Sequence, residues 1–126
     1  MCLYSWQKRK KATKDIECYK IFVKTDGVIR SRYYVYRWKF GEIQESQKAL
    51  PGRIKRDGEV TSGYFHSYNS LSEAKRSLLC YKENEILCKC IIPKGSYYYY
   101  GIHSDGHEGY ASKKLKITEI ISEYNG

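Results

Sequence analysis

Hydrophobic and polar residues alternate along much of this chain, and alternation with a period of two is typical of half-buried β-strands. The clearest alternation runs from Val28 to Phe40, and its second half has aromatic side chains at every second position. A shorter one covers Cys18 to Val23. Because the turn pair Asp26-Gly27 separates the two, the pattern predicts a hairpin or two neighbouring strands.

Four further stretches are predicted as strands, namely Glu59–Tyr68, Glu85–Ile92, Tyr97–Tyr100 and Leu115–Ile121. One face of the second stretch combines isoleucine with cysteine, at Ile86, Cys88, Cys90 and Ile92. That apolar face predicts a buried strand. Pro93-Lys94-Gly95 follows as a turn, and a polar loop is expected over residues 101–109.

One helix is predicted, over about residues 70–82. Ser70 and Glu73 form a capping box, in which each side chain accepts a backbone N–H at the start of the helix. Apolar residues follow at helical spacing, at Leu71, Ala74, Leu78 and Tyr81. Residues 41–58 have no clear period, so we expect a long loop there, with room for one helical turn at Glu42–Lys48.

The order of these elements predicts an α+β fold, with a mainly antiparallel β-sheet and one main helix. The length of 126 residues and the hydrophobic fraction of 41% fit a single folded domain. We expect that domain over residues 16–126. No apolar period ties residues 1–15 to it, so they are predicted to form a basic flexible arm.

The formal net charge of +9 indicates an anionic partner, although part of that charge is local. Five of the 23 Lys and Arg residues lie in residues 1–14, which hold no acid, and a second basic patch covers residues 53–56. Such segments either bind nucleic acid or keep a protein soluble.

The cysteine count and the lack of long apolar runs favour a cytoplasmic protein. An odd number of cysteines, five, cannot pair fully within one chain, so we expect reduced thiols. No apolar run approaches the roughly 20 residues that cross a bilayer, and no apolar stretch of a secretory signal follows the basic residues 8–11. No membrane partner is therefore expected.

Cys88-x-Cys90 and His103-x-x-x-His107 together supply the ligand types of a tetrahedral zinc site. One residue separates the cysteines, whereas zinc motifs have two to four, and the cysteines share their strand face with isoleucines. We therefore favour buried core cysteines, with no metal and no cofactor.

The polar loop holds a second cluster, made of His103, Asp105, His107 and Glu108. Such residues can perform acid–base chemistry or bind a cation. Solvated loops have the same composition, so a role for this loop stays open.

Fourteen tyrosines are the most unusual feature of the composition. Beside cations, exposed tyrosines can stack on nucleic-acid bases, but Tyr and Arg are equally enriched in protein interfaces. The preference of tyrosine for strands explains part of the count. The candidate binding residues are Arg30, Arg32, Tyr34, Tyr36, Arg37, Arg53, Lys55, Arg56, His66, Tyr98 and Tyr100.

Three motifs follow one another along the chain. They are Gly63-Tyr64-Phe65-His66-Ser67, Glu73-Ala74 and the run Ile92-Pro93-Lys94-Gly95-Ser96-Tyr97-Tyr98-Tyr99-Tyr100-Gly101. With these motifs the segment from Cys18 to Ile121 resembles a group of small, uncharacterised proteins of phages and gut bacteria. The resemblance implies a mobile-element origin and no particular activity.

Phe65-His66-Ser67 and Pro93-Lys94-Gly95-Ser96 also resemble two elements of the Arg-Ser-Glu class of ADP-ribosyltransferases. That class places its catalytic Glu just before the last core strand, where this chain has Ala111-Ser112-Lys113-Lys114. Glu108, the nearest carboxylate, comes several residues early. The resemblance therefore implies an inactive nucleotide-binding relative at most.

The chain contains no Gly-rich phosphate loop, nucleophile elbow or His-Glu-x-x-His motif, so no common class of enzyme is indicated. The leading hypothesis is a non-enzymatic binding protein of phage or mobile-element type. It would act on a host macromolecule, protein or nucleic acid, through a Tyr/Arg-rich basic surface. The alternatives are a nucleic-acid-binding module and the inactive transferase-like domain, and any of the three could form an oligomer.

The buried-cysteine interpretation can be checked by metal analysis. Because Cys88 and Cys90 share a face with isoleucine, the purified protein should contain only substoichiometric zinc. A stoichiometric ion that disappears in a Cys88→Ser, Cys90→Ser double variant would contradict it.

Overall fold

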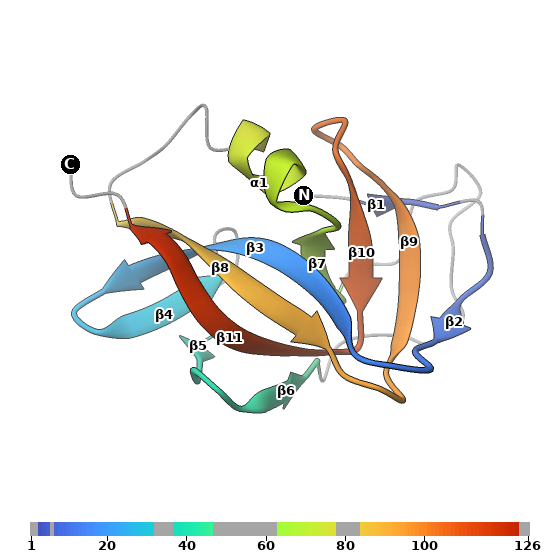
Figure 1. Cartoon of the computed structure of the whole chain (residues 1–126), viewed down its shortest axis with the longest axis horizontal. Helices are drawn as coiled ribbons and strands as arrows, with labels where there is room; N and C mark the ends of the chain where they lie inside the picture. The colour runs from blue at the N-terminus through green and yellow to red at the C-terminus, as the bar shows by residue number, and fades with distance from the viewer. Residues whose placement is uncertain (1–2, 6, 32–36, 47–62, 78–83, 124–126) are drawn as a thin grey trace.

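The computed structural model describes residues 3–5, 7–31, 37–46, 63–77 and 84–123. They form an antiparallel sheet of 11 strands with one short helix (Figure 1). The elements are β1 (Leu3–Tyr4), β2 (Lys10–Lys11), β3 (Ile16–Thr25), β4 (Val28–Ser31), β5 (Arg37–Trp38), β6 (Ile43–Glu45), β7 (Phe65–Tyr68), α1 (Leu71–Ser77), β8 (Glu85–Ile92), β9 (Tyr97–His103), β10 (Glu108–Ser112) and β11 (Lys114–Glu123). The predicted class, mainly antiparallel β with one helix, is confirmed at this level.

The sheet follows the order β1-β9-β10-β7-β3-β8-β11-β6. β4 and β5 extend from β3 as an antiparallel ribbon, and β2 pairs with the first part of β9. The sheet is strongly twisted, so β9 and β10 run at a steep angle to β8 and β11 (Figure 1). This twist places the β9–β10 hairpin at one end of the molecule and the β3–β4 hairpin at the other.

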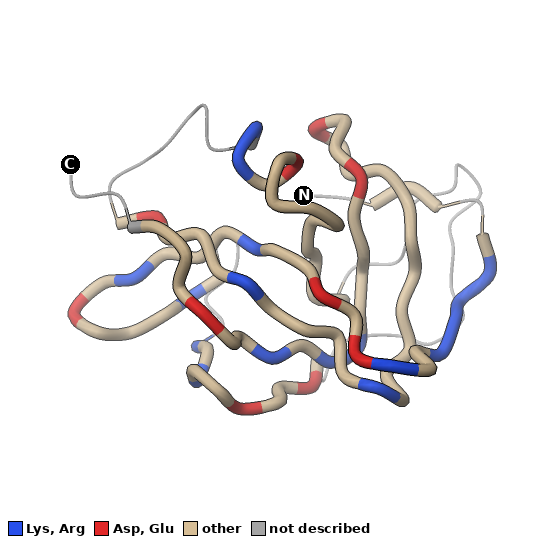
Figure 2. The backbone as a smooth tube through the Cα atoms, viewed as in Figure 1, with Lys and Arg blue, Asp and Glu red and all other residues tan. Residues whose placement is uncertain are grey.

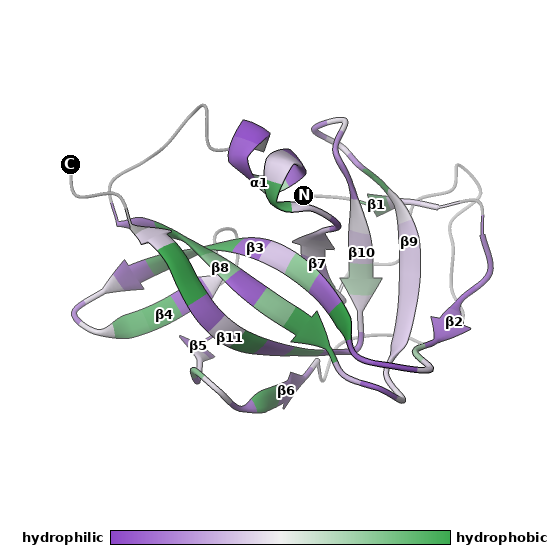
Figure 3. Ribbon diagram, in the orientation of Figure 1, coloured by the Kyte–Doolittle hydropathy of each residue, from purple (hydrophilic) through white to green (hydrophobic). Residues whose placement is uncertain are grey.

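The main core lies on one face of β3, β8 and β11, where apolar side chains alternate with polar ones (Figure 3). Cys18 and Cys90 stand directly opposite each other across β3 and β8, as do Phe22 and Ile86. Trp38 closes this core, with ring centroids 5.1 Å from Phe22 and 4.6 Å from Phe65. Cys88 and Cys90 are fully buried in it, which confirms the predicted buried face of Glu85–Ile92.

α1 begins at the predicted cap, because the Ser70 hydroxyl accepts the Glu73 N–H at 3.2 Å. The carboxylate of Glu73 does not complete the capping box and instead reaches His107, with Oε2 2.6 Å from Nδ1. Ala74 packs the helix against β3 and β8 in a second core cluster. The helix is described to Ser77, and the rest of the predicted span lies outside the described residues.

The single strand predicted over Val28–Phe40 is wrong. β4 and β5 pair with each other in antiparallel fashion, with Ile29 opposite Trp38, so the chain reverses between them. The alternation of aromatic residues continues through the reversal without Gly, Pro or Asn, and it therefore gives no turn signal. Residues 32–36 are outside the described part.

Two predicted loops contain strands. The suggested helical turn at Glu42–Lys48 is wrong, since Ile43–Glu45 forms β6, which pairs with β11. The loop predicted over 101–109 is largely a hairpin, because β9 extends to His103 and β10 begins at Glu108. Glycines in both strands hide the alternation there.

Two short strands tie the segment predicted as a flexible arm to β9. Leu3 and Tyr4 in β1 pair with His103 and Ile102, and β2 pairs with the other end of the same strand. Ala12 adds two backbone hydrogen bonds with the turn before β9. A Cβ at Gly101 would lie 2.0 Å from the Tyr4 carbonyl oxygen, so β1 can approach only because this residue has no side chain. No described helix is long and apolar enough to span a membrane.

Replacement of Leu3 by Ala tests whether residues 1–15 are attached or detached. Leu3 is 0% exposed and packs in a cluster with Tyr64, Tyr99 and Ala111, so Leu3→Ala should lower the free energy of unfolding by about 2 kcal/mol in urea denaturation. Ile43→Ala, at a side chain that is 57% exposed, serves as the control and should cost under about 0.5 kcal/mol. Equal, small effects of both variants would favour the flexible arm.

Candidate functional site

The candidate binding residues that the structure describes lie in three separate places. Arg30 and Arg37 face each other across β4 and β5. Tyr98 and Tyr100 lie in β9, and His66 lies in β7. β10, β7 and β3 separate β9 from β4, so these residues do not form one continuous surface. The other six candidates lie outside the described residues, namely Arg32, Tyr34, Tyr36, Arg53, Lys55 and Arg56.

Tyr98 and Tyr100 make contacts within the protein. Tyr110 of β10 packs between them, with ring centroids 5.8 Å and 5.6 Å away. Tyr98 and Tyr110 also pack against the main core, while the Tyr100 hydroxyl donates to Glu108 at 2.5 Å. That hydrogen bond, with some burial, raises the pKa of Tyr100 to about 12. These tyrosines therefore hold the hairpin together and are poorly placed to stack on a ligand.

Tyr97, on the other face of β9, is 40% exposed and lies under two cations. The Arg9 guanidinium carbon is 4.0 Å from its ring centroid, and the Lys11 ammonium is 5.9 Å away. Both distances fall within the range of cation–π attraction. Figure 2 shows that the residues leading into β2 form an unbroken run of positive charge along this edge.

Beside Tyr97 lies a cavity of about 280 Å³, which we call the basic pocket. Two separate stretches of the chain bring cations to it, one at Arg9 and the other at Lys113 and Lys114. Its lining residues are Arg9, Glu45, Tyr64, Gly95, Ser96, Tyr97, Lys113 and Lys114. Three cations against one carboxylate give the pocket a positive potential, which favours an anionic ligand.

The cations of the basic pocket differ in how they are held. The Lys113 ammonium donates to the Ser46 carbonyl and lies 3.9 Å from Glu45, so it is fixed and partly neutralised. The Lys114 backbone N–H donates to the Ser96 hydroxyl, but its ammonium has no partner among the described residues. Lys114 is therefore the cation most available to a ligand.

The Tyr64 hydroxyl is a neutral polar group in the lining of the basic pocket. Burial and the neighbouring Tyr99 raise the pKa of Tyr64 to about 12, against a lowering by Arg9. The phenol therefore stays protonated at neutral pH, and its hydroxyl is hydrogen-bonded to Tyr99 and Arg9 within the protein.

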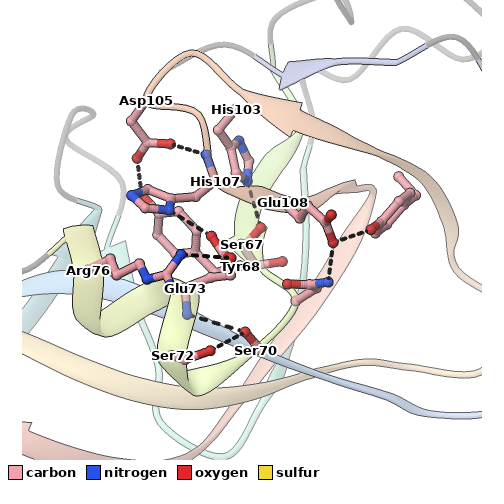
Figure 4. A network of polar contacts seen from close by, with 12 residues as sticks. Ser67, Tyr68, Ser70, Ser72, Glu73, Arg76, His103, Asp105, His107 and Glu108 are labelled. Carbon is pink, nitrogen blue, oxygen red and sulfur yellow. Dashed lines mark hydrogen bonds and ion pairs between the residues drawn. The ribbon is translucent and has the colours of Figure 1, made fainter.

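A second polar site, the histidine cluster, lies where β7, α1 and the β9–β10 turn meet (Figure 4). It contains all three histidines of the chain: His66, His103 and His107. Tyr68 stands among them, with ring centroids 5.2 Å from His103 and 6.0 Å from His107. From the sequence, only the loop members His103, Asp105, His107 and Glu108 could be grouped, because Tyr68 and Glu73 come from other elements.

One continuous chain of hydrogen bonds organises the histidine cluster. The Tyr68 hydroxyl donates to Asp105 Oδ2 at 2.7 Å, and the His107 N–H donates to the other oxygen of that carboxylate at 3.1 Å. His107 Nδ1 in turn lies 2.6 Å from Glu73, which connects the hairpin to α1. The cluster therefore fastens the helix to the sheet.

His103 is 1% exposed, although the sequence pattern placed it in a polar loop. Its Nε2 lies 2.7 Å from the Ser67 carbonyl, which can only accept, so Nε2 carries the proton. Burial lowers the pKa of His103 to about 4. A Cβ at Gly109 would lie 2.2 Å from this ring nitrogen, so the histidine fits only against a glycine.

Burial also lowers the pKa values of Lys20 and His66. The Lys20 ammonium donates to the His66 carbonyl at 2.5 Å, and burial lowers the pKa of Lys20 to about 8. Burial, His103 and Lys20 together lower the pKa of His66 well below its usual value. Both His66 and His103 are therefore neutral near pH 7.

The metal site and the transferase-like site that the sequence raised as alternatives can be compared with the described residues. Among the described side chains, no group of three or more His, Cys, Asp or Glu is arranged to hold a metal ion. Ser96 of the transferase-like motif lines the basic pocket, whereas Glu108 lies in the histidine cluster and binds Tyr100 and Asn69. The structure does not bring these two motif residues into one site.

Burial of neutral His103 makes stability depend on pH. The folded pKa of about 4 lies below the usual 6.5, so the unfolded chain takes up the proton first and stability falls as pH drops from about 6.5 to about 4. Between pH 7.5 and pH 5, the free energy of unfolding should fall by about 2 kcal/mol more in the wild type than in His103→Gln, whose amide can keep the donor to Ser67. Equal pH dependence in urea denaturation would contradict this.

Comparison of the chain with protein-family models, with curated proteins and with solved structures gave no match. The choice between the two sites therefore depends on their chemistry. The polar groups of the histidine cluster bond to one another, whereas the basic pocket presents an exposed aromatic ring and an ammonium with no partner among the described residues. The basic pocket is the better candidate for binding a partner.

Proposed function

We propose that this chain is a non-enzymatic binding protein that engages an anionic macromolecule of its host through the basic pocket and the cations of β2. The observation that carries the proposal is the placement of Arg9 over the exposed ring of Tyr97, at the rim of a pocket that also holds Lys113 and Lys114. The resemblance to phage proteins supports a host partner.

Fixed positions distinguish these cations from those of a solubility tail. β2 is hydrogen-bonded to β9, and Ala12 is bonded to the turn before it, so residues 9–12 follow the edge of the sheet. Lys10 and Lys11 are exposed along that edge. A polyanion can contact them in a set geometry without first ordering a loose segment.

Single-stranded nucleic acid matches this surface best among polyanions. Proteins that bind it without sequence preference combine a positively charged path for the backbone with aromatic side chains on which bases stack. Lys10 and Lys11 supply such a path, and Tyr97 supplies an exposed ring beside it. An acidic protein surface would use the same charges but would gain little from the ring.

Binding to labelled single-stranded DNA of about 12 nucleotides, followed by fluorescence anisotropy, tests the proposal. With about four phosphate contacts, affinity should fall about 50-fold between 50 and 200 mM salt. Lys10→Ala, Lys11→Ala should flatten the slope of log K against log salt by about 1.4, and Tyr97→Ala should weaken binding at every salt concentration.

Lys75→Ala, Arg76→Ala is the matched control, because it removes two exposed charges from α1 and should leave the slope nearly unchanged. No binding at 50 mM salt, or equal effects of the two double variants, would contradict the proposal. If the β2 charges matter but Tyr97→Ala has no effect, the partner is an acidic protein.

A further inference from the structure

We infer that the basic pocket receives a terminal phosphate of the bound strand, an inference that rests on the proposed function. Internal phosphates of a strand are phosphodiesters with one negative charge each. A terminal phosphomonoester carries about −1.5 to −2 near pH 7 and offers three oxygens as acceptors. The two kinds of phosphate therefore need different sites.

The size of the basic pocket fits the end of a strand. Its volume of about 280 Å³ is at the lower limit of pockets that enclose whole ligands. It can take one phosphate with part of its nucleotide, but not a stretch of chain. The exposed residues of β2 lie beside it, so a strand that begins in the pocket can continue along Lys10 and Lys11.

The charge of the basic pocket also matches a dianion. Arg9, Lys113 and Lys114 against Glu45 leave an excess of two positive charges. Because Glu45 is close to Lys113, that excess is concentrated on Arg9 and Lys114. A phosphodiester would neutralise only half of it.

Some polar groups of the basic pocket are hydrogen-bonded within the protein, and others remain for a ligand. The Ser96 hydroxyl already donates to the Tyr97 carbonyl and accepts the Lys114 N–H, so it is occupied. The Lys114 ammonium has no partner among the described residues. This ammonium and the guanidinium of Arg9 are the donors that would contact the terminal oxygens.

Oligonucleotides of one sequence with a 5′-phosphate, a 3′-phosphate or free hydroxyls at both ends test the inference. In the wild type, one phosphorylated form should bind at least about tenfold more tightly than the hydroxyl form, as expected of charge-assisted hydrogen bonds. Lys114→Ala should bring that ratio near one. Lys116→Ala, at a position of β11 that does not line the pocket, should keep the ratio.

The outcomes separate this inference from the proposed function. Binding of all three oligonucleotides with equal affinity overturns the terminal-phosphate site and leaves strand binding in place. No binding of any of them overturns both. A free mononucleotide that binds as tightly as the phosphorylated oligonucleotide would show a nucleotide pocket with no role for the strand, and would also overturn the inference.

Discussion

The pairing of β9 with the N-terminal segment is the interaction on which the candidate site depends. Without it, Arg9 and Lys11 would belong to a loose basic tail, and their charge would be spread over many conformations. The backbone bonds of β1 and β2 hold both ends of that segment against a single strand. Cations that follow no apolar pattern thus acquire fixed positions around one tyrosine.

The two polar sites differ in how their charges are balanced. At the histidine cluster, the sheet and α1 exclude water, so the buried imidazoles lose their charge and the remaining polar groups bond to one another. The basic pocket instead brings three cations together with one carboxylate, and this excess of positive charge favours an anion.

The sequence predicted those parts of the structure that depend on interactions between residues close together in the chain. The buried face of β8 and the serine cap of α1 follow from the residue period and the side-chain type, so both could be found in advance. The reversal between β4 and β5 could not, because alternation fixes which side chains face inward but not where the chain turns. The basic pocket draws on residues from position 9 to position 114, and nothing in the sequence brings those segments together. The sequence predicted Tyr98 and Tyr100 as binding residues, whereas the more exposed tyrosine of this run is Tyr97, because four identical residues do not indicate which of them faces solvent.

The four consecutive tyrosines of β9 raise a problem of strand slippage. A shift by one residue normally exposes the wrong side chains and is strongly disfavoured. Within a run of identical residues, the same shift replaces one tyrosine by another and would cost little free energy. The residues that flank the run make the shift unfavourable. A slip would carry Gly101 away from the Tyr4 carbonyl and bring a side chain into a space that has no room for one. A single glycine beside the run therefore decides that Tyr97 is exposed and that Tyr99 is buried.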